Sequence, residues 1–219
     1  VTTDFGLCGA CWRDTPFITG LVCDACGTPL PGTEADATPG QPVHCDECLT
    51  IARPWSRGRA ALLYADNGRS IVLALKHGDR LDLAHPTARW MLKAAQPLLE
   101  PDMIVAPVPL YWTRLFKRRY NQSAVLSTSV ARLAGLEHCP DLLCRTRQTH
   151  SQEGRSRDGR FANMQGAIAL HPRRAARAKG RNVLLVDDVM TSGATLAAAA
   201  EACLAGGASR VCVLVLARV

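Results

Sequence analysis

Two neighbouring carboxylates at the end of an apolar run have the clearest chemical potential in the chain. Val183 to Val186 are four consecutive apolar residues, as expected of a strand covered on both faces, and Asp187 and Asp188 follow directly. In open α/β sheets, ligands bind outside the carboxyl ends of the strands. We therefore expect both acids at the binding edge of such a sheet.

A turn rich in small and hydroxyl-bearing residues comes next and leads into an alanine-rich helix. The turn holds Thr191, Ser192, Gly193, Ala194 and Thr195. Free N–H groups at the start of a helix attract anions, a glycine lets a ligand approach the backbone closely, and hydroxyls can donate to phosphate oxygens. The segment therefore predicts a phosphate-binding loop beside two carboxylates.

A pair of acids after an apolar strand could also hold Mg²⁺ in a P-loop nucleotide hydrolase. That fold uses the glycine-rich sequence G-x-x-x-x-G-K-[ST] to cradle the phosphates. The sequence contains no such segment. The P-loop interpretation is therefore set aside.

Cysteines are concentrated at the start of the chain, where six of the ten form three C-x-x-C pairs within 48 residues. Eighteen residues separate Cys26 from Cys45, a spacing typical of a structural zinc ribbon, in which each thiolate lies about 2.3 Å from the metal. A disulfide framework and a redox C-x-x-C are the alternatives, disfavoured because the sequence shows no secretory leader and no βαβ context there. The predicted zinc ligands are Cys23, Cys26, Cys45 and Cys48.

The first C-x-x-C pair, Cys8 and Cys11, is left over once one four-thiolate site is filled. His44 could substitute for a thiolate, although a solvated loop histidine is the simpler interpretation. Because the chain starts at Val1, only seven residues before Cys8, we expect a further C-x-x-C pair upstream in the intact protein. The complete module would then be a double zinc ribbon, with Cys8 and Cys11 as additional metal ligands.

Charge is distributed unevenly along the chain, although the formal net charge is only +7. Residues 1–52 hold one arginine against seven acids, a net of −6, whereas residues 114–181 hold fifteen Lys or Arg against four acids, a net of +11. The acidic zinc module is therefore unsuited to phosphate contact and is better suited to scaffolding or partner docking. The basic middle could attract nucleic acid or a phosphate-rich metabolite, or it could be an ordinary solvated face.

Strand and helix patterns alternate along the rest of the chain. The predicted strands are residues 59–64, 103–108, 183–186 and 211–216, with weaker candidates at 142–144 and 167–170; the predicted helices are 70–77, 81–99, 121–136 and 195–204. This alternation predicts an α/β fold with a mainly parallel, doubly wound sheet.

Composition changes near residue 53, where the sequence RPWSRG resembles a linker. We therefore expect a zinc-ribbon module over residues 1–52 and a second domain over 53–219. No apolar run is long enough to cross a bilayer, so membrane insertion is not expected. We expect the protein in the cytoplasm.

The acid pair and the turn after it resemble the phosphoribosyl-diphosphate (PRPP) motif of type I phosphoribosyltransferases. Further landmarks narrow the resemblance to the ComF family, in which a zinc ribbon precedes a phosphoribosyltransferase domain. They are Leu75-Lys76-His77-Gly78, Pro107-Val108-Pro109-Leu110, Arg118-Arg119-Tyr120-Asn121-Gln122 and the C-terminal Val213 to Arg218. The departures are mild: Tyr120 stands where the family usually has Phe, and Tyr111-Trp112 where His-Pro is common.

The resemblance implies a type I phosphoribosyltransferase fold and roles for individual residues. Asp187 and Asp188 would be catalytic and hold the ribose hydroxyls, and residues 191–195 would hold the 5′-phosphate. The loop Val108, Pro109, Leu110 up to Trp112, with Arg114 and Lys117 nearby, would receive the diphosphate. Mg²⁺ would be bound mostly through the diphosphate, ribose hydroxyls and water.

Residues 145–160 are too polar to pack and match in position the mobile lid of the type I enzymes. Arg155 and Arg157 are the candidates for closing over diphosphate, with a plain solvated loop as the alternative.

The resemblance implies a Mg²⁺-dependent phosphoribosyltransferase linked to DNA uptake and competence, and nothing in the sequence indicates the acceptor. The alternative is a non-catalytic scaffold that binds single-stranded DNA or a competence protein through the basic middle. A degenerate scaffold would tolerate loss of the acid pair or of Gly193. Because all three residues are present, we favour ligand binding.

Overall fold

The computed structural model describes residues 6–38, 40–77, 80–149 and 156–219. Its centre is a five-stranded sheet in the order β1-β7-β6-β2-β3, in which every neighbouring pair is parallel. The strands are β1 (Arg57–Leu63), β2 (Ile104–Pro107), β3 (Glu137–His138), β6 (Asn182–Met190) and β7 (Arg210–Arg218). The predicted parallel sheet is confirmed, and β3 is a strand that the sequence patterns missed.

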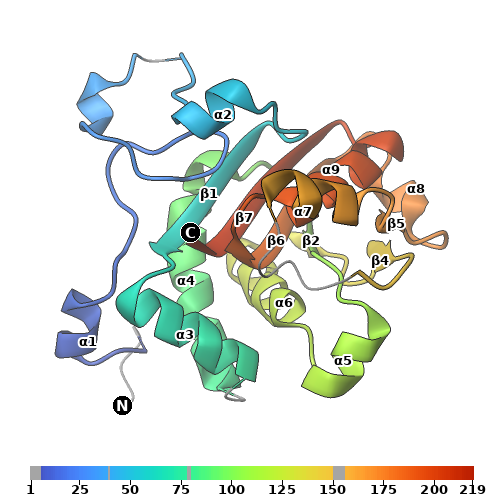
Figure 1. The fold of residues 1–219 in the computed structure, drawn as a ribbon, viewed down its shortest axis with the longest axis horizontal. Coiled ribbons are helices and arrows are strands. Elements are labelled where there is room, and N and C mark those ends of the chain that lie inside the picture. The colour runs from blue at the N-terminus through green and yellow to red at the C-terminus, as the bar shows by residue number, and fades with distance from the viewer. Residues whose placement is uncertain (1–5, 39, 78–79, 150–155) are drawn as a thin grey trace.

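Helices cover both faces of this sheet, as the doubly wound prediction required (Figure 1). On one face lie α3 (Asp66–His77), α4 (Ala84–Ala95) and α6 (Gln122–Ala134), and on the other lie α7 (Arg157–Met164) and α9 (Ala194–Ala205). Side chains of β6 alternate between the two cores: Val183 and Leu185 pack with α9, and Leu184 and Val186 with α4 and α6. This two-sided burial explains the continuous apolar run that predicted the strand.

The remaining elements differ more from the sequence patterns. The weak strand candidates are β4 (Leu143–Arg145) and β5 (Ile168–Leu170), which form an antiparallel pair outside the central sheet. The long helix expected over 81–99 is α4 flanked by the 3₁₀ turns η2 (Leu81–Leu83) and η3 (Gln96–Leu98). Some short elements were predicted by no sequence pattern: α1 (Gly9–Arg13), η1 (Glu34–Asp36), α2 (Asp46–Thr50), α5 (Trp112–Arg118) and α8 (Ala175–Ala178).

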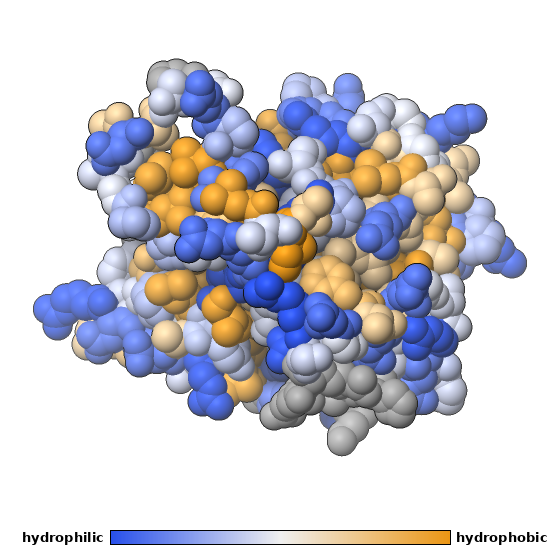
Figure 2. Space-filling view, turned by 45° about the horizontal axis from the view of Figure 1, so that its top comes forward, coloured by the Kyte–Doolittle hydropathy of each residue, from blue (hydrophilic) through white to orange (hydrophobic). Residues whose placement is uncertain are grey.

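The cysteine-bearing segment packs directly against the sheet. Cys23, Cys26 and Cys48 belong to the same buried core as α9. The Gly58 N–H donates to the carbonyl of Asp24 at 2.7 Å, which ties the segment to β1. Figure 2 shows this segment, at the upper left, as part of one continuous surface with the rest of the molecule.

Residues 53–58 form a buried connection, so the expectation of a linker there is wrong. Trp55 is buried, and its indole Nε1 donates to the carbonyl of Ala25 at 2.6 Å. The Ser56 N–H joins the edge of the sheet by donating to Val211 O at 2.9 Å. Proline, glycine and charge suggested a linker, but the tryptophan anchors the segment between the cysteines and the sheet.

Across the described ranges of the chain, no helix is long and apolar enough to cross a membrane.

Candidate functional site

The two acids lie in the part of β6 that extends beyond its neighbour β2. The pairing of β6 with β2 ends at Val186, opposite Pro107, whereas its pairing with β7 continues to Met190. Asp187 and Asp188 are therefore inside the strand. The sequence pattern had predicted them just after its end. Since β2 stops short, one edge of β6 is left open beside the acids.

Asp187 is held from the side of α6. Ser123 Oγ donates to Asp187 Oδ1 at 2.7 Å, and the N–H of Asp188 donates to the same oxygen at 2.9 Å. Burial raises the pKa of Asp187 to about 7, the charge of Asp188 adds to that effect, and the bond from Ser123 opposes it. An acid with such a pKa is a typical feature of functional sites.

Asp188 is paired with Lys76 at the end of α3, where Nζ lies 3.3 Å from Oδ2. Two further contacts hold this end of α3: Tyr120 Oη donates to Leu75 O at 2.6 Å, and Gln122 Nε2 donates to Lys76 O at 3.4 Å. Two motifs far apart in the sequence therefore meet behind the acid pair. Both motifs were recognised in the sequence, but neither Lys76 nor Ser123 was predicted to belong to the site.

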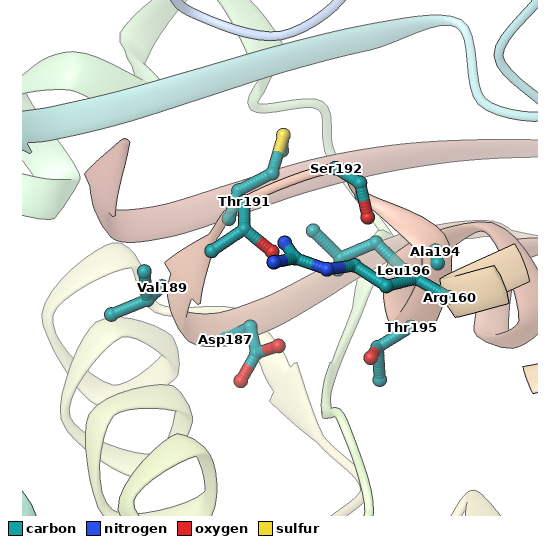
Figure 3. A pocket seen from close by; sticks show the side chains of 10 residues that line it. Arg160, Asp187, Val189, Thr191, Ser192, Ala194, Thr195 and Leu196 are labelled. Carbon is teal, nitrogen blue, oxygen red and sulfur yellow. The ribbon is translucent and has the colours of Figure 1, made fainter. Parts of the chain in front are cut away.

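The predicted phosphate-binding loop lines a pocket that is open to solvent. Asp187 and all of residues 191–195 line it, together with Arg160 from α7. Figure 3 shows the Arg160 side chain extending over this pocket, with Asp187, Thr191 and Ser192 around it. The structure thus brings the predicted loop and one acid together and adds a cation that the sequence analysis did not name.

Gly193 occupies the N-cap position of α9 with φ 80° and ψ 3°, a left-handed conformation that favours glycine. A Cβ at this position would lie 3.0 Å from Arg53 Nη1 and 3.1 Å from the ring of Trp55. Glycine is therefore required both by the backbone angle and by the close packing behind the loop.

The loop predicted to receive diphosphate follows β2 and lies beside β6. The N–H of Val108 donates to Val186 O at 2.9 Å, and the carbonyl of Pro109 accepts a bond of 3.0 Å from Arg145 Nε. Asn121 Nδ2 donates to Val108 O at 3.0 Å. Val108 and Pro109 are thus fixed at the same edge of the sheet as the acids, and Leu110 follows them along the chain. The side chains of Arg114 and Lys117 lie outside the described part.

The predicted lid is helical at its end, so its description as a loop through residue 160 is wrong. Helix α7 begins at Arg157, capped by Ser156 Oγ, which accepts a bond from the N–H of Gly159 at 3.2 Å. Arg157 pairs with Glu47 of the cysteine-bearing segment at 3.2 Å, and Arg160 is the arginine that lines the pocket. Arg155 lies outside the described residues. The Ser-x-x-Gly start of α7 was the signal that could have placed Arg160 on a helix.

The four predicted zinc ligands come together. The Sγ atoms of Cys23, Cys26, Cys45 and Cys48 all lie within 4.8 Å of one another, and the Cys26 and Cys45 sulfurs are 3.7 Å apart. Zn–S bonds of about 2.3 Å in a tetrahedron place sulfurs about 3.8 Å apart, so the geometry fits structural zinc.

Cys8 and Cys11 are exposed at the start of α1, and His44 is absent from the cysteine cluster. The N–H of Cys11 donates to Cys8 Sγ at 3.5 Å. Among the described residues, neither cysteine joins a group of three or more possible metal ligands. A second metal site that uses this pair stays a prediction.

Comparison with known protein families matches the N-terminal and the C-terminal parts of the chain. Residues 1–54 match the model of the Double zinc ribbon domain, and residues 117–219 match that of the Phosphoribosyl transferase domain. The "DNA utilization protein YhgH" of Escherichia coli (strain K12) is 31% identical over 220 residues, which cover 98% of this chain and 91% of that protein. "Competence protein F" of Haemophilus influenzae is 28% identical, over 87% of this chain and 81% of that protein. The chain belongs to the ComF family.

The ComF architecture of a zinc ribbon joined to a type I phosphoribosyltransferase fold agrees with the parallel sheet and with the cysteine cluster. A solved structure of the "allosteric regulatory enzyme of purine biosynthesis" is 17% identical, with a TM-score of 0.43. It covers 66% of this ComF chain, which spans 30% of the length of that enzyme.

Proposed function

We propose that this ComF protein is a Mg²⁺-dependent phosphoribosyltransferase that binds PRPP. The observation that carries the proposal is the pocket in which Asp187 and a glycine-capped helix N-terminus share one wall. A helix N-terminus with free N–H groups suits a phosphate, and a carboxylate beside it suits the hydroxyls of a ribose. PRPP carries both groups on one small molecule.

Each part of the pocket then has a role. Residues 191–195 bind the 5′-phosphate through backbone N–H groups and hydroxyls. Asp187 and Asp188 accept hydrogen bonds from the ribose hydroxyls and stabilise positive charge that develops on the sugar as the diphosphate leaves. Residues 108–110 and Arg160 face the leaving diphosphate, with Arg155 and Arg157 as further candidates near the predicted lid.

The donor set also fits Mg²⁺ bound together with the ligand. One oxygen of Asp187 is occupied by Ser123 and the Asp188 N–H, and one oxygen of Asp188 faces Lys76. The protein thus leaves few carboxylate oxygens for a metal, which suits an ion that takes most of its ligands from diphosphate, ribose and water. Bound Mg²⁺ would supply charge neutralisation of the diphosphate.

Calorimetry with PRPP and Mg²⁺ tests the proposal. We expect binding by the wild-type protein, no binding by Asp187→Asn, and weak binding when EDTA removes Mg²⁺. Asp82→Asn is the matched control, because Asp82 pairs with Arg80 on the exposed surface. We expect this variant to bind PRPP normally. Equal affinities of the wild-type protein and Asp187→Asn would refute the assigned site.

The names of the two relatives connect their own functions to DNA utilization and competence. We propose the same context for this chain, with the protein acting in the cytoplasm during DNA uptake. The acceptor of the ribosyl group would be found by screening amines and bases for diphosphate release.

A second candidate function, binding of single-stranded DNA, is favoured by α5. Trp112 and Phe116 in this helix are 59% and 80% exposed, and their ring centres lie 6.2 Å apart. The helix projects at the lower right of Figure 1 and lies in the basic stretch of the sequence. Exposed aromatic rings among basic residues suit bases that stack and phosphates that need cations.

Fluorescence anisotropy with a labelled oligonucleotide tests this second function. We expect salt-dependent binding that persists in Asp187→Asn and weakens about tenfold in Trp112→Ala, since one stacking contact is worth about 1–3 kcal/mol. Leu49→Ala, at an exposed position of the acidic module, is the control. Absence of binding at low salt would exclude the function.

A further inference from the structure

Three arginines surround one carboxylate behind the phosphate-binding loop. Glu47, in the short helix α2 that carries Cys48, has Oε1 at 3.0 Å from Arg53 Nη2 and 3.2 Å from Arg157 Nη2, and Oε2 at 2.8 Å from Arg218 Nη2. The side chains of Arg53 and Arg218 are only 2% and 6% exposed. Burying two guanidinium groups around one acid is costly unless their other donors are also used.

One further donor of each buried arginine, its Nη1, holds a carbonyl of the phosphate-binding loop. Arg53 Nη1 donates to Ser192 O at 2.7 Å, and Arg218 Nη1 donates to Thr191 O at 2.8 Å. In a trans peptide the C=O of one residue and the N–H of the next point in opposite directions. The N–H groups of Ser192 and Gly193 are therefore turned away from the two arginines.

These two N–H groups are available for a ligand. Ser192 and Gly193 both line the pocket, and within the described ranges neither N–H donates to a backbone carbonyl. The arginines thus impose the peptide orientation that an anion requires, although they touch only the carbonyl side of the loop.

The same arginine and its neighbour Trp55 connect the loop to both cysteine knuckles. Arg53 lies beside the thiol of Cys48. The Arg53 guanidinium also lies 5.5 Å from the centre of the Trp55 ring. The indole Nε1 of Trp55 donates a hydrogen bond to the carbonyl of Ala25, a residue between Cys23 and Cys26 in the sequence. Gly193 packs against both side chains.

We infer that the zinc ribbon is a positioning element of the phosphate site, acting through Glu47, Arg53 and Arg218. Bound zinc fixes the knuckle that carries Glu47, Glu47 fixes the two buried arginines, and these arginines fix the Thr191 and Ser192 peptides. Loss of zinc therefore loosens the loop and lowers its affinity for a phosphate ligand. By linkage, a ligand in the pocket raises the affinity of the protein for zinc by the same factor. The affinity part of this inference rests on the proposed function, whereas the ordering of the loop does not.

Calorimetry on Arg53 variants tests the affinity part. Arg53→Lys keeps the positive charge, but its ammonium group lacks the planar guanidinium that contacts both Glu47 and Ser192 O. We therefore expect the affinity for PRPP with Mg²⁺ to fall about tenfold at unchanged zinc content. Arg53→Met should lose more, and Arg173→Lys, at an exposed position, should lose nothing. Wild-type affinity in both Arg53 variants would overturn the inference while leaving the proposed function intact.

Hydrogen exchange without any ligand tests the ordering of the loop. We expect the amides whose acceptors lie in the loop, Ala197 N–H bonded to Gly193 O and Val219 N–H bonded to Met190 O, to exchange faster in Arg53→Met and after chelation of zinc, relative to amides of α4 in the same sample. If exchange responds in this way but the wild-type protein does not bind PRPP, the positioning role stands and the proposed function fails. Unchanged exchange in the loop after either treatment would overturn the positioning role.

Discussion

The two sides of the candidate site are supported by different layers of the molecule. The acid side, Asp187 and Asp188, is held by Ser123 of α6 and Lys76 of α3, which cover one face of the sheet. The phosphate side, Thr191 and Ser192, is held by Arg218 and Arg53 behind the loop, on the face where the cysteines pack.

These supports also differ in chemistry. On the acid side, a hydroxyl and an ammonium group contact the carboxylates themselves, and both act to lower the pKa of Asp187 against the effect of burial. On the phosphate side, the arginines contact carbonyls and change only the direction of the neighbouring N–H groups. Residues only a few positions apart in the sequence thus depend on opposite faces of the sheet, and variants can separate the two dependences.

Removal of zinc should produce the largest effect, and mainly on the phosphate side. Cys48→Ser or a strong chelator should lower the melting temperature by more than about 10 °C, because metal binding is coupled to folding of the knuckle. Differential scanning fluorimetry measures this effect. Cys203→Ser is the comparison, since Cys203 is a buried cysteine outside the cluster, and an equal loss in both variants would argue against a special role of the four thiolates.

A Cβ at Gly193 should be the next most harmful change. Gly193→Ala forces a left-handed residue against Arg53 and Trp55, so we expect loss of stability together with loss of PRPP affinity. Gly180→Ala is the matched control, because Gly180 has φ 72° but open space around its Cβ, and should cost only about 1 kcal/mol. Similar stability losses in the two variants would show that packing behind the loop does not matter.

Neutralising Lys76 should affect the acid side alone. Lys76→Met removes the partner of Asp188 and raises the pKa of Asp187 further, since Lys76 opposes the effects of burial and of the Asp188 charge. We expect PRPP affinity to fall about tenfold at pH 7, with most of the loss recovered at higher pH. Lys93→Met, at an exposed position of α4, is the control in titration calorimetry across pH. A loss that does not depend on pH would contradict the electrostatic explanation.

The smallest effect concerns stability and has a defined sign. Burial and Asp188 raise the pKa of Asp187 from 3.8 to about 7, so between these pH values the folded protein holds a proton that the unfolded chain has released. The stability contributed by this group therefore falls as pH rises through that window and is lowest above pH 7. Asp187→Asn should raise the melting temperature by a few degrees at pH 8 and by much less at pH 4.5. An opposite trend would mean that the acid is stabilised in its charged form.

Local patterns were sufficient to predict much of the fold. Strands β6 and β7 were predicted because burial on both faces demands continuous apolar residues. The helix between them, α9, was predicted as well. Elements whose identity depends on neighbours, such as the two-residue β3 and the short helices α5 and α7, were missed. The position of β2 between β6 and β3 and the exclusion of β4 and β5 from the main sheet followed only from the arrangement in space.

The sequence alone determined which groups the site contains: two acids, a glycine-capped turn and four cysteines at zinc-ribbon spacing. Their chemistry depends on residue type and short spacing, which a sequence displays directly. The tertiary structure decided what supports them, since Arg53 reaches Ser192 across 139 positions and Ser123 reaches Asp187 across 64. No local sequence pattern indicates such contacts, because the sequence does not show whether an arginine is buried or exposed. Folding alone brings the zinc knuckle behind the phosphate-binding loop.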